Sequence, residues 1–346
     1  MMRASAAPLV ARFAAVAATI ACLCAPACFL NPYRDLTDVD DRVRSPSASD
    51  CAGCHVEIAA EFFASEHAAS FDDPAFVAAT SQRTFTDCLG CHAPVSVYTP
   101  GIPELRTQHR EEGVTCIACH FDGDVLAGPA PRSALVDPHP VAAERPLYRS
   151  SELCAKCHEG TAVEWRGAAE PKRTCQECHM KAVTRKLTQA TDRFSAVLVS
   201  FEDPFEGRSH SFQVDAIAGI EDAFDARITG VSPAANGASS VRVRIDNKTP
   251  HDVPTGDFGS RRVSIDLVVL GAGDAALSRR TVDLLSADGS ELKVGESRDF
   301  DVEARGTEVV YVELEGRFRP GDVLETDCTA HEATGDVSVP VVVSFF

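Results

Sequence analysis

The feature that most constrains this chain is a CxxCH motif that occurs five times between Cys51 and His179. The copies read CAGCH, CLGCH, CIACH, CAKCH and CQECH, and they begin at Cys51, Cys88, Cys116, Cys154 and Cys175. Successive copies start 37, 28, 38 and 21 residues apart, whereas the units of a stacked solenoid keep a fixed period. The motif is therefore a recurring local site and not a structural repeat.

Three kinds of cysteine site compete to explain the motif. Zinc ribbons pair their CxxC knuckles, but zinc does not need a histidine after every second cysteine, and five knuckles leave one unpaired. A thioredoxin-type dithiol lies on one strand-to-helix turn and is not repeated in this way. Disulfide bonds account for cysteines in an exported protein but not for the adjacent histidines.

Covalent haem attachment explains every position of the motif. Two thiols at this spacing form thioether links to one porphyrin, and the adjacent histidine supplies the proximal nitrogen to iron. The sequence therefore predicts five covalently bound haem c groups. The predicted attachment residues are Cys51, Cys54, Cys88, Cys91, Cys116, Cys119, Cys154, Cys157, Cys175 and Cys178, and the predicted proximal ligands are His55, His92, His120, His158 and His179.

The region that carries the motifs has little regular apolar periodicity. One stretch, VEIAAEFFASEHAAS after His55, has Ile58, Ala59 and Phe62 at helical spacing. The remainder predicts short helices and long loops. Large apolar macrocycles can supply the core that these side chains do not. We therefore expect this region not to fold without haem.

The histidines outside the motifs decide whether both axial positions of each iron are filled by the protein. An electron-transfer haem usually has both axial positions filled by the protein, whereas a catalytic haem leaves one open. If residues 55–67 are helical, a rise of about 1.5 Å per residue separates His55 from His67 by about 18 Å, so His67 should reach a different haem. The predicted sixth ligands are His67, His109, His139, His210 and His251, and His331, in a β-rich stretch, is expected to be a bystander.

The N-terminal segment predicts export. The apolar run FAAVAATIACLC follows Arg3 and Arg12, has the length of a signal peptide and is short for a membrane span. Residues 1–28 are thus predicted to be a signal peptide and residues 29–47 a polar tether. Cys22 and Cys28 each follow an alanine and resemble a lipobox, which leaves membrane attachment through a lipid as an alternative. The predicted location is the periplasm or, for a lipoprotein, the outer membrane or cell surface.

The charge balance bears on partners. The chain has 33 basic and 51 acidic residues and a net charge of −18. That balance argues against nucleic-acid binding, which needs basic surface. It suits transient docking with basic patches on redox partner proteins, in the periplasm or on a membrane. A merely solvated acidic surface is the alternative interpretation.

The C-terminal region predicts strands. VRVRID and VYVELE alternate with period two, and RRVSIDLVVL, RDFDVEA and VSVPVVVSFF add further candidates between turns such as GAGD and SADGS. About seven short strands indicate an all-β, sandwich-like domain of immunoglobulin type. The predicted organisation is an α-helical, loop-rich pentahaem domain over 48–190 and this β domain over 191–346. Cys328 is expected to be a buried thiol.

Several segments resemble the bacterial multihaem cytochrome c family, which includes the tetrahaem electron acceptor of hydroxylamine oxidoreductase. They are FFASEHAAS, EGVTCIACH, DPHPVAAERPLYRSSELCAKCH, CQECHM and GRSHSF. The resemblance covers about residues 48–260 and implies distal haem ligation by His67, His139 and His210. NKTPHDVPTGDFGSRR resembles a loop that follows a strand in some relatives, whose histidine faces a haem. That implies that His251 docks the β domain on the haem domain.

Three functions fit these patterns. The first is an electron carrier with bis-histidine haems. The second is an oxidoreductase that acts on a small nitrogen or sulfur compound at one open haem, and the third is a structural subunit or haem filament. No motif has the CxxCK form that is typical of the active haem in the pentahaem nitrite reductases. The six spare histidines are enough to ligate five irons. The balance favours the carrier over a catalyst.

Overall fold

The structure, a computed structural model, describes residues 46–123, 125–131, 139–191, 193–212, 223–256, 262–270, 276–285, 289–304, 309–317, 331–332 and 341–345. The predicted signal peptide, nearly all of the tether, both lipobox cysteines and Cys328 lie outside these ranges, as does the side chain of His331. Within the described ranges, no helix combines the length and the apolar character needed to cross a membrane.

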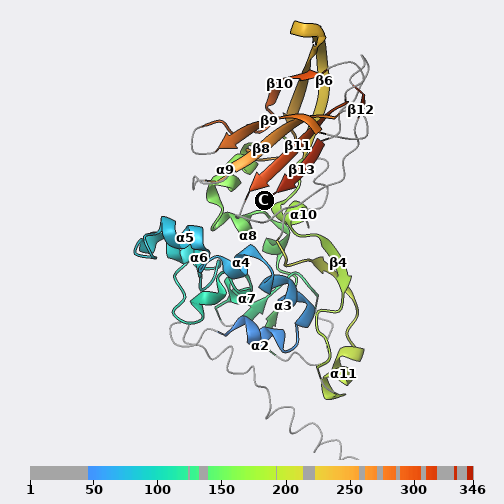
Figure 1. Ribbon diagram of the computed structural model, residues 1–346. Coiled ribbons are helices and arrows are strands. Elements are labelled where there is room, and N and C mark those ends of the chain that lie inside the picture. Colours follow the sequence, from blue (N-terminus) through green and yellow to red (C-terminus); the bar gives the residue numbers. More distant parts are fainter. Residues whose placement is uncertain are drawn as a thin grey trace, which may run out of the picture.

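Short helices and the five motifs occupy one end of the molecule (Figure 1). The motif helices have only four or five residues, too few to be stable alone, so their neighbours must hold them in place. They are α2 (Ala48–Ala52), α6 (Leu89–His92), α7 (Cys116–His120), α8 (Glu152–Ala155) and α10 (Cys175–His179). The others at this end are α3 (Val56–Phe63), α4 (Glu66–Ala69), α5 (Pro74–Ala79), α9 (Glu159–Gly167), α11 (Arg193–Ser200), η2 (Thr86–Cys88), η3 (Arg110–Glu112) and η4 (Pro146–Arg149).

Two of these helices begin with a capping box, in which the side chains of the first and fourth residues bond each other's backbone N–H groups. Ser47 and Asp50 form one at α2, and Thr174 and Glu177 form another at α10. Minor strands complete this end: β1 (Phe121–Asp122), β2 (Val125–Ala127) and β3 (Val141–Ala142) form one sheet, and β4 (Ala182–Arg185) pairs with β5 (Phe205–Arg208).

The helical end has a small side-chain core. Its described buried hydrophobic cluster consists of Phe71, Leu89 and Ala93, with Phe76 and Leu105 packed against it. The other buried apolar residues there are mainly alanines, which bury little area each. This sparse core agrees with the expectation that the region needs an additional apolar component.

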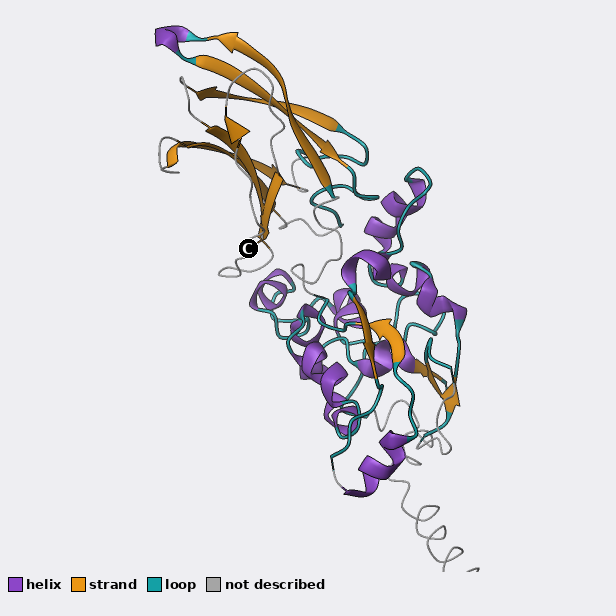
Figure 2. Ribbon diagram, turned by 90° about the vertical axis from the view of Figure 1, so that its right-hand side faces the viewer, coloured by secondary structure: helices purple, strands orange, loops and turns teal. Residues whose placement is uncertain are grey.

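Strands form the opposite end of the molecule (Figures 1 and 2). One sheet has the order β10-β7-β6, and the other has the order β12-β11-β8-β9, with β13 parallel to β11. The strands are β6 (Phe224–Pro233), β7 (Ser239–Asn247), β8 (Arg262–Leu270), β9 (Ala276–Leu285), β10 (Ser297–Ala304), β11 (Val309–Arg317), β12 (His331–Glu332) and β13 (Val341–Phe345). The predicted strands are thereby confirmed.

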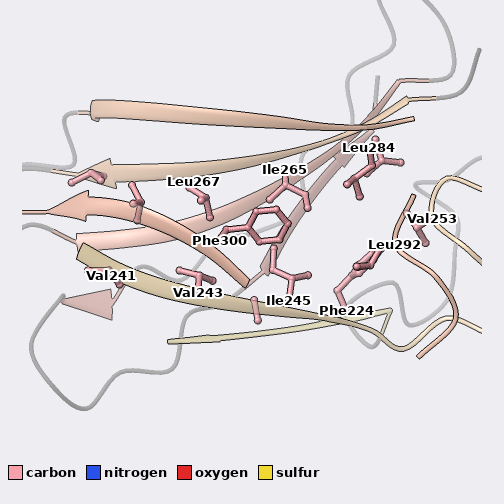
Figure 3. Close-up of a cluster of buried hydrophobic side chains, with 14 of the residues drawn as sticks. Phe224, Val241, Val243, Ile245, Val253, Ile265, Leu267, Leu284, Leu292 and Phe300 are labelled. Carbon is pink, nitrogen blue, oxygen red and sulfur yellow. The ribbon is translucent and has the colours of Figure 1, made fainter. Parts of the chain in front are cut away.

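The two larger sheets share one hydrophobic core. Side chains from both sheets, including Ile245, Ile265 and Phe300, meet between them (Figure 3). Alternation produces this arrangement, because every second residue of β7 points inward. The intervening Arg242 and Arg244 point outward and pair with Asp301 and Asp299, directly opposite on β10.

Residues 193–212, which the sequence pattern assigned to the β domain, pack with the helical end. Strand β5 pairs with β4, the backbone N–H of Ser209 donates to the Lys181 carbonyl, and that of His210 donates to the Glu61 carboxylate. Glu61 also binds Arg185 through two hydrogen bonds of 2.7 and 2.8 Å. The larger sheets therefore begin only at Phe224, because the apolar run in α11 lacks strand alternation and forms a helix.

Candidate haem sites

Each motif winds into about one helical turn, which brings its two thiols and its imidazole together. The backbone N–H of His55 donates to the Cys51 carbonyl over 2.9 Å, and that of His158 donates to the Cys154 carbonyl over 3.0 Å. All ten motif cysteines are free and partly buried. The described residues contain no cluster of three or more metal-binding side chains of the kind that zinc requires.

Three of the motif histidines have a defined tautomer. The Nδ1 atoms of His55, His92 and His120 lie 2.8, 2.8 and 2.7 Å from the backbone carbonyls of Leu187, Ser70 and Ala127. A carbonyl only accepts, so each Nδ1 carries the proton and each Nε2 keeps its lone pair. This is the arrangement found in most metal-ligating histidines.

Four of the five motif histidines face a histidine from elsewhere in the chain. The ring centres are 6.5 Å apart for His55 and His139, and 6.2 Å apart for His67 and His158, for His120 and His210, and for His179 and His251. A ligating histidine nitrogen lies about 2 Å from its metal, and the ring centre lies about 1 Å farther back. Two imidazoles on opposite sides of one metal thus have centres about 6 Å apart, as in these pairs.

The protonation of the facing histidines also fits ligation. Burial lowers the pKa values of His67, His179 and His210 to about 4, and neighbouring histidines add to the effect. These imidazoles are therefore neutral near pH 7, which is the form that binds a metal. The Nδ1 atom of His210 is buried and has no hydrogen-bond partner among the residues that the structure describes. The residues present thus suit axial ligation of haem iron at four motifs.

His92, in the second motif, differs. Among the histidines whose side chains are described, none faces it at a comparable distance, and Phe76 stacks on its ring with centres 3.6 Å apart. His109, the remaining predicted sixth ligand, directly precedes η3, and its half-exposed ring lies 3.7 Å from the Glu111 carboxylate. The structure does not bring His109 and His92 together, and ligation by His109 stays a prediction.

Contacts between motifs arrange them in a continuous series. The side chains of Cys51 and Cys116, of Cys91 and Cys157, and of Cys154 and Cys175 lie next to each other. The Phe212 ring lies 4.4 Å from the ring of His67, which faces the fourth motif, and 5.9 Å from that of His210, which faces the third. The first motif therefore adjoins the third, the third the fourth, and the fourth both the second and the fifth.

The loop after β7 carries His251 to the fifth motif. The Asn247 amide donates to the carbonyls of His251, Leu292 and Lys293 over 3.0, 3.0 and 3.1 Å and so fixes the loop. On the other side, Glu164 Oε2 of α9 accepts from the Asp252 backbone N–H at 2.9 Å and from the Thr255 hydroxyl at 2.6 Å. Helix α9 lies next to the sheets in Figure 1, and these bonds attach the β end to the helical end.

Arg106 is a structural residue that sequence reasoning missed. Its side chain is fully buried, and its guanidinium makes five hydrogen bonds without a carboxylate partner. The acceptors are the carbonyls of Gln108, Pro94, His109 and Gly113 and the Thr115 hydroxyl. Arg106 therefore fastens the segment between the second and third motifs. Its spacing from the motifs gave no signal of this role.

Two comparisons with known proteins agree with this chemistry. Residues 50–121 match the family model described as "Cytochrome c554 and c-prime". The fold resembles the crystal structure of a penta-haem cytochrome c552 from Thermochromatium tepidum, with a TM-score of 0.53 and 19% sequence identity, over 79% of this chain and 91% of that one. No curated protein matches the sequence.

Together with the motifs, the match over residues 50–121 makes this part of the chain similar to multihaem c-type cytochromes, and the structural comparison shows a shared fold.

Proposed function

We propose that the chain is an exported pentahaem c-type cytochrome that transfers electrons between redox partner proteins through bis-histidine haems. The observation that carries the proposal is the set of four facing histidine pairs. Haem c, when bound, supplies reversible one-electron reduction and oxidation at iron. Five motifs provide cysteines and a proximal histidine for five such groups.

The chain's own residues favour transfer over catalysis. A histidine on each side of an iron would leave no position for a substrate, and backbone carbonyls hold the Nδ1 protons of His55 and His120. Burial keeps the distal rings of His67 and His210 neutral and ready to ligate. The contacts between motifs support an array that is continuous from the first motif, which begins in α2, to the fifth, beside the β domain.

The β domain supplies one of these ligands. On this proposal His251 closes the fifth site, and Glu164 and Asn247 hold its loop in place. The shared core of the two sheets supports a sandwich, and we infer an immunoglobulin-like topology. The same proposal includes functional similarity to the electron acceptor of hydroxylamine oxidoreductase. It also includes lipid attachment at Cys22 or Cys28.

The net charge of −18 suggests partners with basic docking surfaces. Stopped-flow reoxidation of the reduced holoprotein by a basic cytochrome c tests this, with an acidic single-haem cytochrome of similar potential as the control acceptor. We expect fast transfer to the basic acceptor that slows as salt is added, because exposed charges are screened over about 8–10 Å at 0.10–0.15 M salt. Transfer that is slow to both acceptors would contradict the carrier role.

A second candidate function rests on His92. Because no described histidine side chain faces its ring, the second motif is the place where an open iron position fits best. If the chain is an oxidoreductase, its small nitrogen or sulfur substrate would bind at this iron. Addition of nitrite, hydroxylamine or carbon monoxide separates the candidates, since an open iron binds them at once, whereas a closed iron binds them only as fast as an axial histidine leaves.

A further inference from the structure

We propose that Tyr148 is a positioning residue that raises the reduction potential at the third motif by sharing the hydrogen-bond acceptor of His120. The inference rests on the proposed function, since it assumes haem bound at Cys116, Cys119 and His120. Tyr148 lies in η4 (Pro146–Arg149), which precedes the fourth motif, and its side chain reaches back to the third.

Both His120 and Tyr148 contact the backbone carbonyl of Ala127. The Ala127 carbonyl lies 2.7 Å from His120 Nδ1 and 2.8 Å from the Tyr148 hydroxyl. The same hydroxyl lies 2.7 Å from the carbonyl of Cys119, within the motif itself. The Tyr148 ring also stacks on the His120 ring, with centres 5.2 Å apart and planes 16° from parallel. Tyr148 thus touches both the imidazole and its acceptor.

The direction of these hydrogen bonds is defined. Carbonyls only accept, so the single Tyr148 proton is directed at the carbonyls of Cys119 and Ala127. The Tyr98 hydroxyl donates to the Tyr148 oxygen over 3.0 Å, which strengthens Tyr148 as a donor. Burial raises the pKa of Tyr148, so the proton stays in place at physiological pH.

Competition for the Ala127 carbonyl lowers the basicity of the His120 imidazole. A hydrogen bond donated by Nδ1 makes a ligating histidine more basic, and a more basic ligand favours ferric over ferrous iron. A carbonyl that accepts two donors binds each more weakly, so Tyr148 makes His120 a less basic ligand. Among the described residues, no second side-chain donor is seen at the acceptors of His55 or His92, so the third motif differs in this respect from the first and the second.

The test is Tyr148→Phe, which keeps the stacked ring and removes the hydroxyl. In a spectroelectrochemical titration of the holoprotein, we expect one midpoint potential to fall while the others stay. One hydrogen bond sets the scale of the change, about threefold to tenfold in the ferric–ferrous equilibrium. Tenfold corresponds to about 59 mV for a one-electron couple.

Two further variants make the result interpretable. Tyr98→Phe should shift the same potential in the same direction by a smaller factor, because Tyr148 then donates less strongly. Thr99→Val is the control, since its hydroxyl donates over 2.9 Å to the carbonyl of Ser96, which no ligand uses. It should leave every potential unchanged.

Unchanged potentials in Tyr148→Phe, or an upward shift, would overturn the inference. If that variant loses haem, Tyr98→Phe decides the question by the same criterion. The wild-type haem count and spin states test the proposed function separately. A wild-type protein with five low-spin haems and a silent Tyr148→Phe variant would retain the carrier and reject the role of Tyr148.

Discussion

Glu164 should control how firmly His251 is held, and Glu164→Ala tests this. In the structure Glu164 Oε2 accepts one hydrogen bond from the backbone of Asp252 and one from Thr255. Hydrogen bonds to a charged group contribute about 1.5–3 kcal/mol each when buried. Glu164 is only partly buried, so we take about 1–1.5 kcal/mol for each, or about 2–3 kcal/mol for both.

A loss of that size makes release of the loop about 30- to 140-fold more favourable, since each 1.4 kcal/mol is a factor of ten. Carbon monoxide binds ferrous haem only after an axial histidine leaves. We therefore expect the rate of carbon monoxide binding at one haem to rise by about that factor. Flash photolysis and rapid mixing with the reduced holoprotein measure it.

Glu164→Gln is the matched control, because its amide oxygen still accepts a hydrogen bond but carries no charge. Its rate should lie between those of the wild type and Glu164→Ala. The reasoning is refuted if Glu164→Ala binds carbon monoxide at the wild-type rate. It is also refuted if several haems become reactive together, since that would indicate general unfolding and not release of one loop.

Three other predictions follow from the structure. Leu267→Ala, in the shared core of the sheets, should lower the free energy of unfolding by about 2–5 kcal/mol in denaturant titrations, whereas exposed Val231→Ala should change it by less than about 0.5 kcal/mol. Burial would raise the pKa of Asp246, but its hydrogen bonds and the charges of Arg227 and Lys248 outweigh burial and lower it. Its stabilisation is thus present above the unfolded pKa of about 3.9 and is lost as pH falls through the folded value, so Asp246→Asn should flatten the pH dependence of stability below about pH 4. His109→Ala should leave the low-spin electron paramagnetic resonance signals of the four paired sites unchanged, and loss of any of them would contradict the pairing.

The local features were accessible from sequence because they depend on neighbours along the chain. A CxxCH motif forms its own turn, and alternation in VRVRID identifies both the inward Val243 and the outward Arg244 of β7. The packing of residues 193–212 with the helical end is not local in this sense, because pairing with β4 and the contact of Glu61 with His210 arise only in the folded chain.

Pairing of the histidines lay beyond sequence reasoning for a physical reason. His67 and His158 are 91 positions apart, and no local rule predicts which of the spare rings meets which motif. Tyr148 and Glu164 gave no signal either, since each acts through a backbone group distant in sequence. Arg106 resembled any charged surface residue until its burial was known.

A haem count combined with low-temperature electron paramagnetic resonance of the oxidised holoprotein tests the central claim most directly. We expect five haem c groups per chain, with low-spin signals of bis-histidine type from the four facing pairs. Fewer than five haems, or high-spin signals from more than the single site at His92, would contradict it.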